Sequence, residues 1–349
     1  MTGRNDSAKG HCRRCQENEP VLTVRTEPLC LDCFNKYVQT KVVKRMETFR
    51  TRYVEADKDR FLLLPMSFGP CSVALLHMLS QHLKRQSGHT GRTGFKLHVL
   101  HIKHDFDDEE IARRLDALKE RYPEHIYSTI NLSSVLDKTT ILQVSLEPSE
   151  SDTPQTVESV LASLASPTSR TDTLHILLRR AASTFALQNS CEAILWSDST
   201  TRLAERTIAE TAKGRGFALP YLTSDCPSPF GLPFYYPLRD LLSKEISSYL
   251  SFLEPPVDDF LIPREVGKQA VSAKNATIDG LMGQYFESVE RDYPSIVANV
   301  VRTTGKLKGK PLSEVEAQCE LCEMPLAGGK APEMSRLCYG CIRTFPQAV

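Results

Sequence analysis

Residues 61–72 read Phe61-Leu-Leu-Leu-Pro-Met-Ser-Phe-Gly-Pro-Cys-Ser72, an apolar run that passes through a short loop into a segment with helical spacing. The run has the length of a buried strand, and the loop holds one glycine, Gly69, between Ser67 and Ser72. A loop that opens onto a helix N-terminus offers free N–H groups and a positive dipole end to an anion. In open α/β sheets, ligands bind beyond the carboxyl ends of the strands. The stretch therefore predicts a nucleotide-binding loop at Ser67, Gly69 and Ser72, with a purely structural turn as the alternative.

Strand-like and helix-like segments alternate from residue 61 to about residue 240. Apolar or alternating runs predict further strands, and apolar residues at helical spacing predict the helices between them. Because strands separated by helices pair in parallel through crossovers, the pattern indicates an α/β fold with a doubly wound parallel sheet. The strands are expected at 61–66, 95–102, 125–130, 193–196 and near 217–222, and the helices at 72–84, 107–122, 174–188 and 200–213.

Residues 149–172 interrupt this alternation. Ten of these twenty-four residues are serine or threonine, and two are proline. Because such a composition buries little apolar surface, it predicts a mobile surface insertion within the core 61–240. Beyond the core, residues 241–310 are predicted to form a helical extension that ends in a basic linker.

Four cysteines near each end of the chain have the spacing of metal ligands. A Cys-x-x-Cys turn presents two thiolates on one side of a tight knuckle, and two knuckles on neighbouring hairpins close a tetrahedron around zinc. This spacing predicts zinc ribbons over residues 1–35 and 311–349, each with one structural zinc, and it also suits iron. The two ligand sets are Cys12, Cys15, Cys30 and Cys33, and Cys319, Cys322, Cys338 and Cys341.

The alternative for these cysteines is pairing in disulfides, which requires an oxidising compartment. The polar stretch at residues 1–10, MTGRNDSAKG, lacks the apolar segment that a secretory signal contains. Free thiols in the cytosol or the nucleus are therefore expected. No apolar run in the sequence is long enough to cross a membrane.

The overall charge argues neither for nor against binding to nucleic acid. Lysine plus arginine and aspartate plus glutamate both number 43, so any RNA-binding surface must come from local clustering. Basic residues cluster in the helical linker predicted at 36–60 and in the linker at 302–310, for which a solvated helix face and a flexible linker are the alternatives. The RNA-binding candidates are Lys41, Lys44, Arg45, Lys306, Lys308 and Lys310.

Four segments, in this order along the chain, carry a resemblance to a known family. They are the loop at 67–72, Trp196-Ser-Asp-Ser-Thr-Thr-Arg-Leu-Ala204, Lys213-Gly-Arg-Gly216 and Pro233-Phe-Tyr-Tyr-Pro-Leu-Arg-Asp240. The loop is similar to a degraded PP-loop, whose pattern is SGGxDS after a hydrophobic strand. With a cysteine module at each end, the chain resembles the cytoplasmic tRNA 2-thiolation protein 2 family over nearly its whole length. The resemblance implies a PP-loop ATPase-like core of the adenine nucleotide alpha-hydrolase type.

The loop departs from the PP-loop pattern at two positions. Phe68 replaces the first glycine, and its side chain is expected to crowd a phosphate that glycine would admit. Cys71 replaces the aspartate and is expected to be a packed residue rather than a nucleophile. ATP binding is therefore doubtful.

The cysteines that the resemblance assigns to thiolation chemistry are also missing. Catalytic members carry a Cys-x-x-Cys shortly before an arginine pair, where it serves an iron–sulfur cluster or accepts sulfur. Aligning Arg179-Arg180 with that pair places Asp172 and His175 at the two cysteine positions. A further cysteine, which the resemblance leads us to expect past the Pro-Leu-Arg segment, has no counterpart in residues 239–263. The resemblance therefore implies no iron–sulfur cluster and no catalytic residue in this chain.

By this resemblance, the chain is the non-catalytic heterodimer partner of a PP-loop thiolase in the cytoplasm. The complex would thiolate the wobble uridine of the lysine, glutamate and glutamine tRNAs to 5-methoxycarbonylmethyl-2-thiouridine. Sulfur would come from a thiocarboxylated ubiquitin-related modifier, a further possible partner, and neither membrane nor DNA is expected to bind. The alternatives are an active ATP-dependent thiolase with an atypical loop and a zinc-ribbon adaptor that does not act on RNA.

Overall fold

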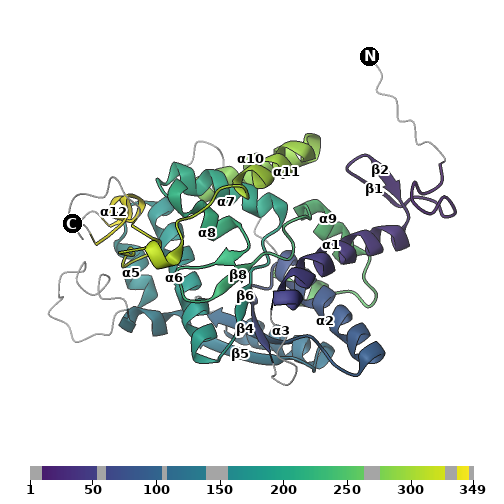
Figure 1. The fold of residues 1–349 in the computed structure, drawn as a ribbon, viewed down its shortest axis with the longest axis horizontal. Helices are drawn as coiled ribbons and strands as arrows, with labels where there is room; N and C mark the ends of the chain where they lie inside the picture. The colour runs from purple at the N-terminus through teal and green to yellow at the C-terminus, as the bar shows by residue number, and fades with distance from the viewer. Residues whose placement is uncertain are drawn as a thin grey trace, which may run out of the picture.

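A six-stranded sheet runs through the middle of the molecule, in the order β5-β4-β3-β6-β8-β7 (Figure 1). The computed structural model describes residues 10–52, 60–103, 108–138, 156–262, 276–326 and 336–345. All neighbouring strands pair in parallel except β7, which is antiparallel to β8. The strands are β3 (Phe61–Pro65), β4 (Lys96–Lys103), β5 (Ile126–Asn131), β6 (Ala193–Leu195), β7 (Cys226–Pro227) and β8 (Pro233–Tyr235).

The sheet separates two hydrophobic cores. In β3, Leu62 and Leu64 face one core and Leu63 faces the other, and all three are fully buried. A strand buried on both faces has no polar side, which explains the unbroken apolar run in the sequence. The predicted doubly wound α/β fold is therefore confirmed.

Helices cover both faces of the sheet. On the Leu62 side lie α1 (Leu31–Arg52), α2 (Pro70–Thr90), α3 (Asp108–Arg121) and α9 (Ser243–Ser251). On the Leu63 side lie α5 (Val157–Ser163), α6 (Pro167–Gln188), α7 (Thr200–Ala212), α8 (Leu219–Thr223), α10 (Ile278–Asp292), α11 (Pro294–Thr304) and α12 (Tyr339–Thr344). The smaller elements are the hairpin β1 (Leu22–Val24) and β2 (Glu27–Leu29), and the 3₁₀ turns Leu132–Lys138, Gly216–Ala218, Asp258–Phe260 and Leu312–Glu314. None of the helices in the described part has the length and apolar character of a bilayer span.

Two predictions of local structure are wrong. Residues 217–222, expected to form a strand, form a 3₁₀ turn and α8 instead, and β8 takes the place beside β6. All five residues of α8 are buried, so its sequence has no periodicity that separates a helix from a strand.

The second error concerns residues 156–172, since 149–155 lie outside the described residues. Most of them are helical, in α5 and the start of α6, because serines, a threonine and Pro167 cap or begin these helices. The Thr156 hydroxyl accepts the Ser159 N–H at 3.2 Å at the start of α5, and Ser166 caps α6 ahead of Pro167.

A buried histidine on α2 makes the fold sensitive to acid. His77 is 8 % exposed, and its Nδ1 lies 2.8 Å from the Tyr122 hydroxyl. Burial lowers the pKa of His77 to about 4. The unfolded chain therefore binds a proton between pH 6.5 and 4 that the folded chain does not, so this contribution to stability is complete above pH 6.5 and is lost as the pH falls.

We expect His77→Gln to lose less stability on acidification than the wild type. The difference should be about 2 kcal/mol between pH 7 and pH 5, since only the wild type has this proton to bind. Urea unfolding at the two pH values measures it. Both proteins carry the same cysteines, so effects of any bound metal cancel, and equal losses would contradict the assignment.

Candidate functional site

The three residues of the predicted nucleotide loop lie together at the end of β3. The Ser67 Oγ is 3.2 Å from the Ser72 Oγ, the Ser72 hydroxyl donates to the Gly69 carbonyl at 3.0 Å, and the Gly69 N–H donates to the Ser67 Oγ at 3.4 Å. These polar groups, which could otherwise bind a phosphate at this position, are therefore hydrogen-bonded to one another.

The first turn of α2 also has few donors to offer. Pro70 has no N–H, and the N–H groups of Ser72 and Val73 both donate to the Gly69 carbonyl, at 3.1 and 3.2 Å. Anion binding at a helix N-terminus depends on unused N–H groups. The loop therefore has the position of a phosphate site, but its two serine hydroxyls and the N–H groups of Gly69, Ser72 and Val73 are already bonded within it.

Phe68 distorts the backbone of this loop rather than crowding it. Its φ is 56°, in the left-handed region, and its ring is fully buried against the His101 imidazole, with 5.0 Å between ring centroids. The Phe68 carbonyl accepts the Ile262 N–H at 3.0 Å. The expectation that this side chain crowds a phosphate is therefore wrong, because burial of the ring turns it into the core.

Two substitutions of Phe68 separate the ring from the backbone. Phe68→Ala should lower the free energy of unfolding by about 3–5 kcal/mol, because a buried ring is lost. Phe68→Gly should be more stable than Phe68→Ala by about 1 kcal/mol, because glycine adopts a positive φ without strain. Chemical denaturation measures both, and a glycine variant that is the less stable of the two would contradict the account.

A cavity of about 530 Å³ opens at the carboxyl ends of β3, β4 and β6. Among its lining residues are Met66, His101, Trp196, Asp198 and Arg206. Arg206 binds Asp198 through two hydrogen bonds of 2.7 and 3.1 Å, and this partner raises the pKa of the guanidinium against the effect of burial. The cavity lies where an α/β sheet binds ligands, but an internal ion pair occupies one side of it.

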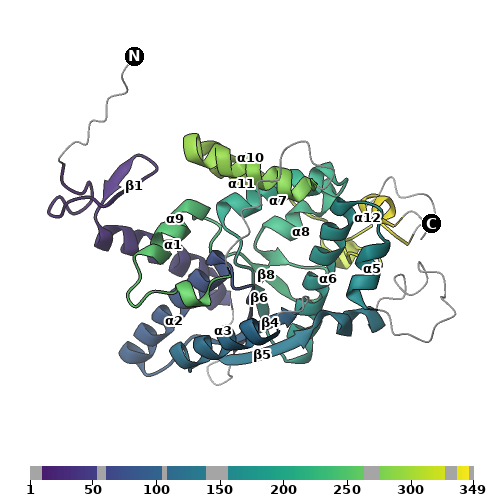
Figure 2. The ribbon, with the colours of Figure 1, turned by 180° about the vertical axis from the view of Figure 1, so that it is seen from behind.

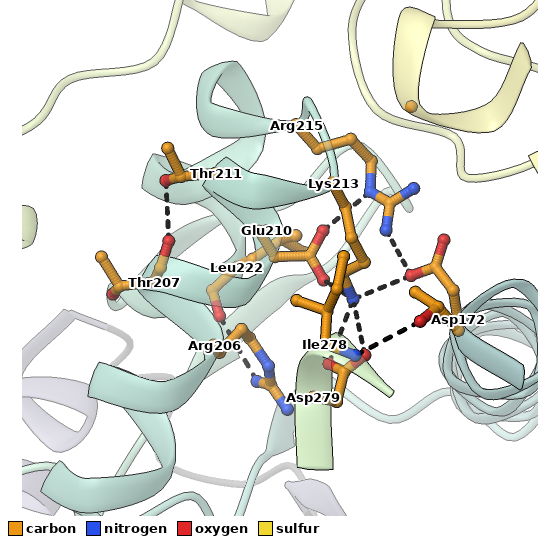
Figure 3. Close-up of polar contacts among 12 residues, drawn as sticks. Asp172, Arg206, Thr207, Glu210, Thr211, Lys213, Arg215, Leu222, Ile278 and Asp279 are labelled. Atoms are coloured by element: carbon orange, nitrogen blue, oxygen red, sulfur yellow. Dashed lines mark hydrogen bonds and ion pairs between the residues drawn. The ribbon is translucent and has the colours of Figure 1, made fainter. Parts of the chain in front are cut away.

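Asp172 and His175, aligned with the catalytic cysteine positions, have different environments. His175 is exposed on α6, whereas Asp172 is buried and binds Lys213 at 2.9 Å and also Arg215. Glu210 and Asp279 complete this buried ion network, at 3.0 and 3.1 Å from the Lys213 Nζ (Figure 3). Asp172 thus holds α6 to the segment after α7.

The C-terminal cysteines form a complete four-thiol group. Cys319, Cys322, Cys338 and Cys341 are all buried, and their sulfurs lie within 4.8 Å of one another. The Cys322 and Cys338 sulfurs are 3.7 Å apart, close to the edge of about 3.8 Å that a tetrahedron with 2.3 Å zinc–sulfur bonds requires. The group can therefore hold a tetrahedral metal ion.

The N-terminal cysteines form the same arrangement with more exposure. The sulfurs of Cys12, Cys15, Cys30 and Cys33 also lie within 4.8 Å of one another, with Cys15 and Cys30 at 3.7 Å. Cys15 and Cys33 are partly exposed. The two modules lie at opposite ends of the molecule in both views, so they do not pack on each other (Figure 1 and Figure 2).

Both modules share one local geometry. The residue after the first cysteine pair, Gln16 or Glu323, has a φ near 60° and donates its N–H to the carbonyl of the first cysteine at 2.8 Å. The second cysteine pair of each module was expected on a hairpin, but it lies at the start of a helix. Cys33 is in the first turn of α1, and Cys338 is the N-cap residue of α12. The positive end of a helix stabilises thiolates.

Side chains of the core hold the C-terminal module in place. Arg180 donates to the carbonyls of Glu320 and Leu321 at 2.7 and 2.9 Å and pairs with Glu323 at 3.1 Å. Gly340 lies against Arg215, where a Cβ would be 2.7 Å from the Arg215 Cγ. The module, pale yellow in Figure 3, therefore lies directly over the buried ion network.

The RNA-binding candidates have unequal surroundings. Arg45 pairs with Asp225 at 3.2 Å and Asp240 at 2.8 Å, so its charge is already compensated. Lys41 lies over the Tyr37 ring at 5.6 Å, while Lys44 is exposed. In the basic linker Lys306, Lys308 and Lys310 are exposed, and the Lys310 carbonyl accepts the Tyr221 hydroxyl at 2.7 Å.

The chain matches the family model described as cytoplasmic tRNA 2-thiolation protein 2 over residues 277–332. Two similar proteins bear that same name. The one from Phaeosphaeria nodorum is 44 % identical over 377 aligned positions, which cover 99 % of this chain and 98 % of the relative. The one from Pyrenophora tritici-repentis is 42 % identical, covering 98 % and 96 %.

Among solved structures, the chain is similar to the U34-tRNA thiolase NcsA from Methanococcus maripaludis with its [4Fe-4S] cluster. The TM-score is 0.61 at 14 % identity, and the match covers 96 % of this chain and 95 % of that one. This likeness establishes the shared fold.

Proposed function

The chain belongs to the cytoplasmic tRNA 2-thiolation protein 2 family, and from this membership we propose that it acts in the 2-thiolation of the tRNA wobble uridine as the partner of a catalytic PP-loop thiolase. The reaction takes place in the cytoplasm on the lysine, glutamate and glutamine tRNAs, and sulfur comes from a thiocarboxylated ubiquitin-related modifier. The partner activates the uridine, and this chain supports the partner and extends the RNA surface.

The observation that carries the division of labour is the loop at residues 67–72. It has the place of a phosphate loop, yet Ser67, Gly69 and Ser72 satisfy one another's hydrogen bonds. Phosphoryl and nucleotidyl chemistry requires preorganised donors aimed at the phosphates. A loop whose hydroxyls and several N–H groups already bond within it supports a structural role in this chain.

Zinc is the metal that we assign to both cysteine groups. Each group has four thiol sulfurs within 4.8 Å of one another, one pair of them at 3.7 Å, and four thiolates supplied by the protein are a donor set of structural zinc. Bound zinc would fix the fold of each module and supply no reactive position, since all four ligands come from the chain.

Reconstitution tests the proposed function. The chain, its catalytic partner and their mixture are each incubated with tRNA, ATP, magnesium and the thiocarboxylated modifier, and 2-thiouridine is measured by mass spectrometry of the nucleosides. We expect product from the mixture and none from this chain alone. Thiolation by this chain alone would show that it is an active enzyme. If the mixture forms no more 2-thiouridine than the partner alone, this chain has no role in the reaction.

A further inference from the structure

A cationic pocket of about 490 Å³ lies where the N-terminal hairpin and α1 meet α11 and the segments around β7 and β8. The sequence predicts basic clusters at 36–60 and 302–310 but not that they meet, because the basic residues of the pocket come from four separate stretches of the chain. Its polar lining includes Arg25, Lys41, Arg45, Ser224, Arg239 and Arg302.

Most of the positive charge in this pocket has no carboxylate partner. The two acids of the lining, Asp225 and Asp240, both bind Arg45, and Arg25 pairs with Glu245 at 3.8 Å. Within the described residues, neither Lys41 nor Arg302 has a carboxylate within 4 Å: the first lies over the Tyr37 ring, and the second donates to the Asn299 side chain at 3.1 Å. The pocket therefore keeps a net positive charge that the fold does not neutralise.

Arg239 adds a buried charge on the inner wall. It is 8 % exposed, and its guanidinium donates to the carbonyls of Val301, at 2.9 Å, and Thr223. No carboxylate of the described part lies within 4 Å of it. Burial lowers the pKa of the Arg239 guanidinium, and the charges of Asp225 and Asp240 offset that effect only in part. A buried charge that makes no direct ion pair is costly, so an anion in the pocket would stabilise the Arg239 guanidinium.

A hydroxyl donor accompanies these charges. The Ser224 Oγ is buried on the pocket wall, and none of the described residues forms a hydrogen bond with it. Hydroxyl groups and arginines together are the usual partners of phosphate oxygens in nucleic-acid complexes.

The pocket continues into a second hollow along α1. This hollow, of about 580 Å³, is lined by Arg14, Lys36, Lys41 and Lys44 and by no acidic residue. Lys41 lines both spaces, so one basic surface runs from the N-terminal metal module to the pocket. Successive basic sites of this kind fit a chain of phosphates better than a single small anion.

We propose that the cationic pocket binds a backbone phosphate of an RNA strand, with the following phosphates along Lys36 and Lys44 of α1. The RNA is the tRNA of the proposed function, on which this inference rests. Lys41 and Arg302 contact the bound phosphate from opposite sides, Arg239 supplies fixed charge behind it, and Arg45 orders the wall through its two aspartates.

The test is the salt dependence of tRNA binding by the full-length chain, measured by fluorescence anisotropy between 50 and 200 mM potassium chloride. We expect Lys41→Gln and Arg302→Gln each to weaken binding about fivefold to tenfold at 0.1 M salt and to reduce the slope of log K against log salt by about one. Arg92→Gln, which removes an exposed arginine just beyond the C-terminal end of α2 that lines neither hollow, should change neither quantity. Lys41→Arg should restore binding.

The outcomes separate this inference from the proposed function. The pocket is not an RNA site if Lys41→Gln and Arg302→Gln behave like Arg92→Gln, or if the wild-type chain does not bind tRNA. Either result leaves the proposed function standing, because the reconstituted thiolation reaction tests that function separately. Inorganic phosphate, followed by ³¹P line broadening, is the second arm. Phosphate binding that the two variants abolish while tRNA binding stays intact would make the ligand a free anion and overturn the inference.

Discussion

Replacing Cys338 with serine is expected to release one of two zinc ions and to lower the free energy of unfolding by at least about 5 kcal/mol, because the binding energy of a structural zinc is folding energy. Cys338 is buried, and its N–H donates to the Cys319 sulfur at 3.3 Å. Its neighbours Leu321, Met324 and Leu337 are part of the main hydrophobic core. Without metal, the module would no longer cover this core.

Native mass spectrometry gives the zinc content of the Cys338→Ser variant, and urea unfolding gives its stability. Cys226→Ser is the matched control, because Cys226 is a core thiol outside both groups, with its sulfur 3.3 Å from the Pro220 carbonyl. Cys15→Ser should also lose one zinc but destabilise less, since the N-terminal module is more exposed. Two zinc ions retained by Cys338→Ser would contradict the assignment of this group as a metal site.

Replacing Asp172 with asparagine is expected to lower the free energy of unfolding by about 3 kcal/mol, because it leaves buried cations with too little negative charge. Asp172 is 2 % exposed and binds both Lys213 and Arg215. The change preserves the shape of the side chain, so the loss reports charge rather than packing. Because Gly340 of the C-terminal module rests on Arg215, the variant should also lose zinc to a chelator faster.

An exposed ion pair provides the control for Asp172→Asn. Asp116 pairs with Lys119 at 2.9 Å with 73 % of its side chain exposed. Asp116→Asn should therefore change the stability by less than about 0.5 kcal/mol. Equal effects of the two substitutions, or an unchanged rate of zinc loss from Asp172→Asn, would contradict a role of the network in holding the module.

Several strands and helices of the core could be predicted because burial leaves a pattern in the sequence. That pattern is a short apolar run in β3, an alternating run in β4 and helical spacing of apolar residues in α3. The fully buried α8 has no period, and α5 and α6 begin with residues whose composition suggested disorder while their positions cap helices.

The cysteine groups could be predicted because metal geometry imposes a local spacing. The buried ion network and the cationic pocket could not, because their members are distant in the chain. Asp172 and Asp279 are 107 positions apart, and Arg25 and Arg302 are further apart still. The motif Lys213-Gly-Arg-Gly216 was the one local hint of the network, since two cations alternating with glycines in a core segment need partners if they are buried, but it does not say which residues those partners are.

The most direct test of the division of labour is thiolation by complexes in which one loop is disabled. Gly69→Trp disables the remnant loop of this chain, and alanine at the first serine of the partner's PP-loop disables the other. After each complex has been shown to assemble and to bind tRNA, the rate of 2-thiouridine formation is measured. We predict a rate within about twofold of the wild type for Gly69→Trp and no product with the disabled partner. Loss of thiolation in an intact, tRNA-binding Gly69→Trp complex would contradict the account.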